Sequence, residues 1–220
     1  QNVFSICTRF PGKREKPMNK QNSTIMKLAE TALLAALCYV SFTFLQIKIP
    51  VPGGDATSLH IGNTFCVLGA LLLGGWYGGL AGSIGMTIAD LMDPVYITGA
   101  PKTFVLKLCI GLITGLVAHK IAKINETNDK KYVFKWSLIA SIAGLAFNVI
   151  ADPIVGYFYK QYILGQPQEV ASILAKLSAG ATFVNAIVST ILVVIIYNAV
   201  RPALIKANLI HVYVTAANAK

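Results

Sequence analysis

The stretch from Leu59 to Ala89 contains no aspartate, glutamate, lysine or arginine. About 20 apolar residues are enough to cross the hydrocarbon of a bilayer, so this stretch is too long for one ordinary span. A glycine-rich segment at 74–79 divides it. We therefore expect two helices, at about 61–73 and about 76–93, with lipid as their main solvent.

The composition of the whole chain supports a membrane protein. Of 220 residues, 55% are hydrophobic and 13% are charged, and the mean hydropathy is +0.63. Soluble domains carry about 25% charged residues. The net charge of +10 is also found in nucleic-acid-binding proteins, but here the basic residues flank apolar runs and form no patch or stripe. We expect a lipid bilayer around the protein and no nucleic-acid partner.

Further apolar runs complete a prediction of six helices. Proline, glycine and charged residues separate the runs, and prolines and glycines interrupt helices. The expected spans are about 25–47, 61–73, 76–93, 103–123, 134–162 and 177–200. Irregular outer segments are expected at about 49–60, 94–102 and 163–176, with a short amphipathic piece just before the last span. The predicted fold class is an all-α integral membrane protein with six transmembrane helices.

Six spans place both termini on one side of the membrane. Most lysines and arginines fall on that side, so the positive-inside rule makes both termini cytoplasmic. Residues 1–17 are polar and basic and lack the apolar core of a signal peptide, so we expect a tag or a disordered N-terminal tail there. The six-helix domain is expected at 18–208, and 209–220 is expected to be a C-terminal tail of native or foreign origin.

No motif of a known catalytic or nucleotide-binding site is present in the sequence. The cysteines show no metal-binding or redox spacing. We therefore expect a protein that is not an enzyme and has no cofactor and no metal site. Asp90 and Asp93 share one helical face, which leaves one alternative open, a membrane enzyme with a metal at this pair.

Polar residues inside the apolar runs are the main candidates for a site, because ionisable residues within spans are costly and usually functional. Asn148 and Asp152 are four residues apart and share a helical face. The candidate substrate-binding residues are Asp55, His60, Asn63, Asp90, Tyr96, Lys102, Lys107, Asn148, Asp152 and Asn185. The alternative is a scaffold subunit in which these residues only join helices and bind no ligand.

Small residues recur at four-residue spacing in two places. Ala32 and Ala36, with Ala29 nearby, give the first predicted helix a smooth face, and glycines repeat in the same way within 74–82. Small residues let helices in lipid approach closely. We expect the glycines to serve internal packing, and the alanine face to be available also to a partner protein.

These features, in this order, resemble the substrate-binding S component of an energy-coupling factor (ECF) vitamin transporter. The resemblance covers about 25–205 and rests on the alanine-rich first helix, the Pro-Gly outer loop, the run 69–82 and the segments 88–91 and 96–107. It implies a six-helix subunit of the bacterial plasma membrane that binds a micronutrient from outside with high affinity. It also implies an outer loop, here about 51–60, that closes over the ligand.

The same resemblance implies partners for the chain. They are a transmembrane coupling protein, which would meet the alanine face at Ala29, Ala32 and Ala36, and two cytoplasmic ATPases. For the substrate, buried Asp and Asn side chains suit a nitrogen heterocycle with hydroxyl or amino groups, which favours pyridoxine or hydroxymethylpyrimidine. Lys102 and Lys107 equally suit a carboxylate such as pantothenate, and riboflavin and folate stay open.

Overall fold

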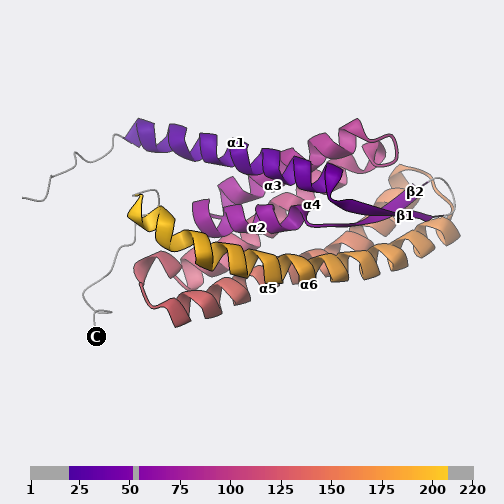
Figure 1. Cartoon of the computed structure of the whole chain (residues 1–220). Coiled ribbons are helices and arrows are strands. Elements are labelled where there is room, and N and C mark those ends of the chain that lie inside the picture. The colour runs from indigo at the N-terminus through magenta and orange to yellow at the C-terminus, as the bar shows by residue number, and fades with distance from the viewer. Residues whose placement is uncertain (1–19, 52–54, 208–220) are drawn as a thin grey trace, which may run out of the picture.

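The computed structural model describes residues 20–51 and 55–207; side chains are described from residue 24 onward, except that of Asp55. The expected tails, 1–17 and 209–220, lie outside the described residues. The described part is built of α-helices and one β-hairpin (Figure 1). The helices are α1 (Lys20–Phe44), α2 (Gly62–Leu73), α3 (Gly75–Met92), α4 (Ala100–Gly115), α5 (Lys130–Phe158) and α6 (Gln168–Lys206). The strands are β1 (Gln46–Val51) and β2 (Asp55–His60), and the short helical turns are η1 (Ile97–Gly99), η2 (Leu116–Ile121), η3 (Ile124–Glu126) and η4 (Tyr159–Ile163).

Four helical stretches of the described chain are long and apolar enough to cross a bilayer, namely Thr24–Phe44, Ile97–Glu126, Lys130–Ile163 and Gln168–Lys206. The helix α2 has 12 residues, and at about 1.5 Å per residue it is only about 18 Å long. The hydrocarbon core of a bilayer is about 30 Å thick. The structure thus supports a helical membrane protein, while the count of six spans and the cytoplasmic placement of both termini stay predictions.

From its prolines and glycines we expected the outer segment at 49–60 to be irregular. That prediction is wrong. The segment is an antiparallel hairpin in which Gln46 pairs with His60 and Val51 with Asp55. The prolines rule out a helix there, but proline is tolerated on an edge strand. The first helix therefore ends at Phe44, before the predicted limit at 47.

The prediction of a short amphipathic piece before the last helix is wrong. The helix α6 starts at Gln168 and continues without a break to Lys206. Pro167 occupies the position just before it, where its missing N–H costs nothing, and Glu169 in the first turn complements the helix dipole. Pro202 lies inside α6 and does not end the helix.

Glycines pack α3 tightly between α2 and α4, which confirms the predicted role of the glycine repeat. Gly74 has a φ of 97° and separates α2 from α3. A Cβ atom at Gly78 would lie 2.0 Å from the backbone nitrogen of Ala70 in α2. On the other face of α3, a Cβ at Gly111 in α4 would lie 2.3 Å from the Cα of Gly79. Side chains larger than hydrogen at these crossings would force the helices apart.

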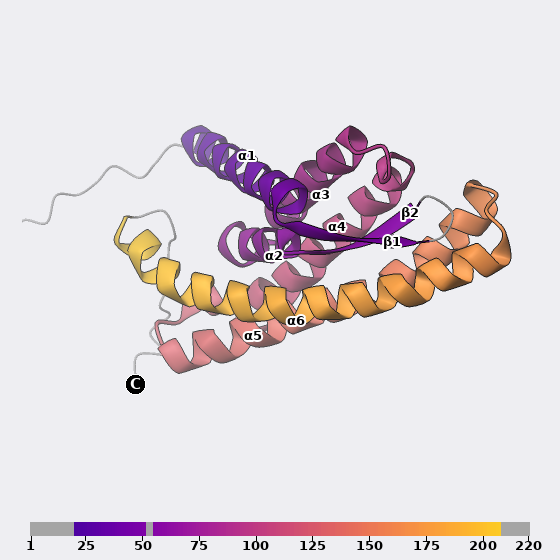
Figure 2. The ribbon, with the colours of Figure 1, turned by 45° about the vertical axis from the view of Figure 1, so that its right-hand side comes forward.

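The ends of the molecule differ in what they carry. The start of α1, the end of α6 and the connection between α4 and α5 lie together at one end (Figures 1 and 2). The hairpin, η1 and the connection between α5 and α6 lie at the opposite end. In both views the hairpin runs between α6 and the α3–α4 pair. The hairpin therefore covers the space that these helices enclose at that end.

Candidate functional site

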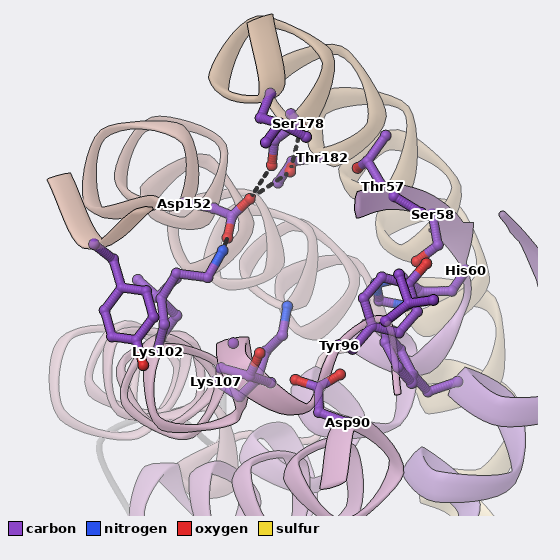
Figure 3. Close-up of a pocket in the computed structure, with 18 of the residues that line it drawn as sticks. Thr57, Ser58, His60, Asp90, Tyr96, Lys102, Lys107, Asp152, Ser178 and Thr182 are labelled. Atoms are coloured by element: carbon purple, nitrogen blue, oxygen red, sulfur yellow. Dashed lines mark hydrogen bonds and ion pairs between the residues drawn. The ribbon is translucent and has the colours of Figure 1, made fainter. Parts of the chain in front are cut away.

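A cavity of about 140 Å³ lies beneath the hairpin, walled by β2, η1, η4 and helices α1 to α6 (Figure 3). Nine of the ten residues that the sequence analysis selected line it: His60, Asn63, Asp90, Tyr96, Lys102, Lys107, Asn148, Asp152 and Asn185. Asp55 is the first residue of β2, and its side chain lies outside the described part. The fold thus gathers residues from 60 to 185 in one place, and their role toward a ligand stays a prediction.

Asp152 in α5 is the centre of a polar network between three helices. Its Oδ1 accepts a hydrogen bond from Lys102 Nζ of α4 at 2.8 Å. Its Oδ2 accepts bonds from Ser178 Oγ at 2.5 Å and Thr182 Oγ1 at 3.2 Å, both in α6 (Figure 3). The carboxylate is thus largely satisfied by the protein itself, and its contacts tie α4, α5 and α6 together at the cavity wall.

Lys107 in α4 and Asp90 in α3 face the same cavity (Figure 3). Both are buried, with 9% of Lys107 and 3% of Asp90 exposed. Yet among the described residues Lys107 has no carboxylate oxygen, and Asp90 no cationic nitrogen, within 4 Å. Charges buried without a close counterion are unfavourable, so both side chains are suited to meet charged or polar groups that enter the cavity.

Asp93 is engaged elsewhere, although it shares a helical face with Asp90. Its Oδ2 forms an ion pair with Lys48 of β1, and the Lys48 ammonium lies 5.3 Å from the centre of the Tyr96 ring. Burial acts to raise the pKa of Asp93, but Lys48 and the amide of Val95 outweigh it and lower that pKa. In the described part of the chain, no three His, Cys, Asp or Glu residues cluster in a way that could hold a metal. The ion pair between Lys48 and Asp93 thus links the hairpin to the end of α3.

His60 at the end of β2 presents a fixed face to the cavity. Its Nδ1 accepts a hydrogen bond from the backbone N–H of Gly62 at 3.2 Å, and its ring packs edge-on against Phe42 at 4.7 Å. Burial, with a further contribution from the charge of Lys107, lowers the pKa of His60 to about 3. The ring is therefore neutral, and because Nδ1 is an acceptor its proton is on Nε2.

Two asparagines add unused polar atoms to the cavity wall. Asn63 in α2 and Asn148 in α5 are both almost fully buried. The Oδ1 atom of each has no hydrogen-bond partner among the residues that the structure describes. Buried polar atoms are normally paired, so these carboxamides are suited to bind a ligand.

Asn185 in α6 lines the cavity and also holds the hairpin, while its predicted role toward a ligand stays a prediction. Its Nδ2 donates to the carbonyl of Ser58, and its Oδ1 accepts from the backbone N–H of His60, each at 3.0 Å. The side-chain amide thus occupies the outer edge of β2 in the way that a neighbouring strand would. Both of its polar atoms serve to hold the hairpin over the cavity.

Replacing Asn185 with leucine is expected to loosen the hairpin, because two buried hydrogen bonds worth about 1 kcal/mol each are lost. Amide hydrogen exchange of the peptide that contains Ser58 and His60, measured by mass spectrometry, should become about tenfold faster or more. The matched control is Asn198→Leu, since Asn198 lies on the same helix and bonds to the carbonyl of Val194. Equal exchange in both variants would show that Asn185 does not anchor the hairpin.

Other residues of the cavity wall were not selected from the sequence. Tyr159 in η4 lines the cavity and donates a hydrogen bond to the carbonyl of Thr98 at 2.8 Å. Several of the others carry hydroxyl groups, which are common in any sequence and give no signal by themselves. They include Thr57, Ser58, Thr98, Thr103, Ser178 and Thr182.

The alanine face of α1 lies outside the cavity. Ala29, Ala32 and Ala36 are exposed. Ala32 and Ala36 line an apolar groove of about 510 Å³ between α1 and α3, together with Tyr39, Ile84 and Ile88. The groove has the shape and apolar character that a transmembrane helix of a partner could fill.

Comparisons with known proteins identify the family to which this fold belongs. Residues 22–202 match the family model of the ECF-type riboflavin transporter, S component. A solved structure of ThiT from Listeria monocytogenes, which is an ECF S component, has the same fold with a TM-score of 0.59 at 19% identity. The match covers 83% of this chain and 98% of that one. No curated protein matches the sequence. The chain belongs to the S component family of ECF-type riboflavin transporters, and it is a multi-pass integral membrane subunit that is not an enzyme.

Proposed function

We propose that this chain is the subunit that binds one molecule of a B vitamin or vitamin precursor for import, and that the ligand lies in the cavity beneath the hairpin. The observation that carries the proposal is a set of buried polar groups that face this cavity and lack a matching partner among the described residues. They are the ammonium of Lys107, the carboxylate of Asp90, which bonds to Thr103 but has no cation within 4 Å, and the carboxamide oxygens of Asn63 and Asn148. Small-ligand sites are enclosed spaces with a few such groups.

The chemistry of the wall leaves two classes of substrate. Carboxylate and carboxamide groups fit a small heterocycle with hydroxyl or amino groups, as in pyridoxine or hydroxymethylpyrimidine. An unpaired lysine fits a substrate with an acidic group, as in pantothenate or folate. The description of the matching family is a further reason to test riboflavin, which the sequence left open.

The proposal includes a docking surface for the transport partners. We assign the transmembrane coupling protein to the groove between α1 and α3, because Ala32 and Ala36 leave its floor open and its walls are apolar. Ala29 extends the same exposed face. Two ATPases would act through the coupling protein, since the chain itself has no nucleotide-binding motif.

A thermal-shift screen of the detergent-purified protein tests this function. The panel contains riboflavin, pyridoxine, hydroxymethylpyrimidine, pantothenate and folate. A compound at 100 times its dissociation constant adds about 2.7 kcal/mol to the stability of the folded state, so one compound should raise the midpoint clearly. In Asn148→Leu, which removes the carboxamide that faces the cavity, the shift should vanish, and in Asn198→Leu it should persist. Folded protein that no compound stabilises would contradict the proposed function.

A further inference from the structure

The ammonium group of Lys107 is a buried charge in the cavity that has no close counterion among the described residues. The side chain comes from α4, is nine-tenths buried, and extends into the cavity (Figure 3). No hydrogen bond or ion pair joins its Nζ to any described residue within the distances at which such contacts form. A buried ammonium without a partner is strongly unfavourable. The described part of the chain supplies no such partner at contact distance, so the ammonium is suited to bind a group of the ligand.

The two aspartates of the cavity do not supply this counterpart. Asp152 already accepts hydrogen bonds from Lys102, Ser178 and Thr182. Asp90 lines the cavity as well, but its oxygens lie more than 4 Å from the Lys107 ammonium. A group placed between Lys107 and Asp90 could therefore contact both without displacing a contact that the protein makes.

The charge and the donors of the wall favour a negative group. Of the charged side chains that line the cavity, Lys102 is paired with Asp152, whereas Lys107 has no carboxylate oxygen within 4 Å among the described residues. The neutral ring of His60 adds a second donor, because its Nδ1 is occupied by the N–H of Gly62. An ammonium without a carboxylate partner, together with a second donor, attracts an anionic group and repels a cation.

Building on the proposed function, we propose that the ligand carries an anionic group, a carboxylate or a phosphate, and that this group binds the ammonium of Lys107. The carboxylate of Asp90 then faces an N–H or O–H group of the same ligand. This assignment separates the two substrate classes that the sequence leaves open. The site is built for an acidic vitamin or a phosphorylated one, and a neutral heterocycle lacks the group that Lys107 requires.

Three matched pairs of compounds test the inference by isothermal titration calorimetry. They are pantothenate and panthenol, riboflavin 5′-phosphate and riboflavin, and pyridoxine 5′-phosphate and pyridoxine. In at least one pair the anionic member should bind the wild-type protein at least tenfold more tightly than the neutral one. Lys107→Met, which keeps the length of the side chain, should remove this preference, and Lys107→Arg should retain it. Lys120→Met, at an exposed lysine in η2, is the matched control and should leave the preference unchanged.

The outcomes separate this inference from the proposed function. If neutral members bind as tightly as anionic ones, or if Lys107→Met binds the anion as well as the wild type does, the anionic assignment is wrong and the binding function stands. If neither these pairs nor the vitamin panel shows any binding, both are wrong. Should Lys107→Met fail to fold by gel filtration, the preference of the wild type and of Lys107→Arg within each pair decides.

Discussion

Replacing Asp152 with asparagine is expected to lower the free energy of unfolding by about 3 kcal/mol. The side chain is 15% exposed, and it holds Lys102, Ser178 and Thr182 at the meeting point of α4, α5 and α6. The change keeps the shape but leaves the ammonium of Lys102 buried without a counterion, and removal of one partner of such a pair costs about 3–5 kcal/mol. Ligand affinity should fall at least tenfold, about 1.4 kcal/mol, because the network shapes the cavity wall.

A double-mutant cycle with Lys102→Met gives the direct measurement. Thermal unfolding in detergent should show the double variant to be more stable than the sum of the single effects predicts, by about 2 kcal/mol. Asp93→Asn is the control, because the partner of Asp93, Lys48, is 43% exposed and such pairs contribute about 1 kcal/mol or less. Additive effects in the Asp152 cycle would show that the network does not couple the helices.

Replacing Gly78 with alanine is expected to cost about 3 kcal/mol or to prevent folding. The added Cβ would lie 2.0 Å from the nitrogen and 2.4 Å from the Cα of Ala70. Backbone atoms cannot move aside as a side chain does, so α2 and α3 have to separate. Overpacking of an interior costs about 1–3 kcal/mol and more where the backbone is blocked. Yield of monodisperse protein and the unfolding midpoint report the effect.

Gly180→Ala is the matched control for this substitution. Gly180 is an exposed residue of α6, and apart from its own helical neighbourhood no described atom lies within 4 Å of the place its Cβ would take. Alanine favours a helix by about 1 kcal/mol over glycine, so this variant should be neutral or slightly stabilised. A Gly78→Ala protein as stable as Gly180→Ala would contradict the close crossing of α2 and α3.

The sequence predicts the parts of this fold that depend on local composition. Long apolar runs must become helices in lipid, and Asp93-Pro94 ends α3 as expected, since that helix stops at Met92. Polar residues within such runs are costly in lipid and therefore lie in the protein interior. For this reason Asp90, Lys107 and Asn148 could be selected without knowing the packing. The glycine repeat likewise predicted close helix crossings.

Contacts between distant residues could not be predicted in this way. The hairpin is held by Asn185, which is 125 residues from His60, and no pattern near 46–60 reports that contact. The same holds for Asp152: its partners Ser178 and Thr182 lie within the expected last span, but they are 26 and 30 residues from Asp152, and no local pattern reports that contact. These long-range contacts determine which side chains are used within the protein. They also determine which side chains remain available to a ligand.

Native mass spectrometry of the purified protein tests the central claim most directly, namely that one vitamin-like molecule occupies the cavity beneath the hairpin. After incubation with the vitamin panel and the phosphorylated compounds, the wild type should carry one added small molecule per chain. Asn198→Leu should carry it too, and Asn148→Leu should appear only as bare protein. A folded wild type that stays bare, or equal occupancy in Asn148→Leu, would contradict the claim.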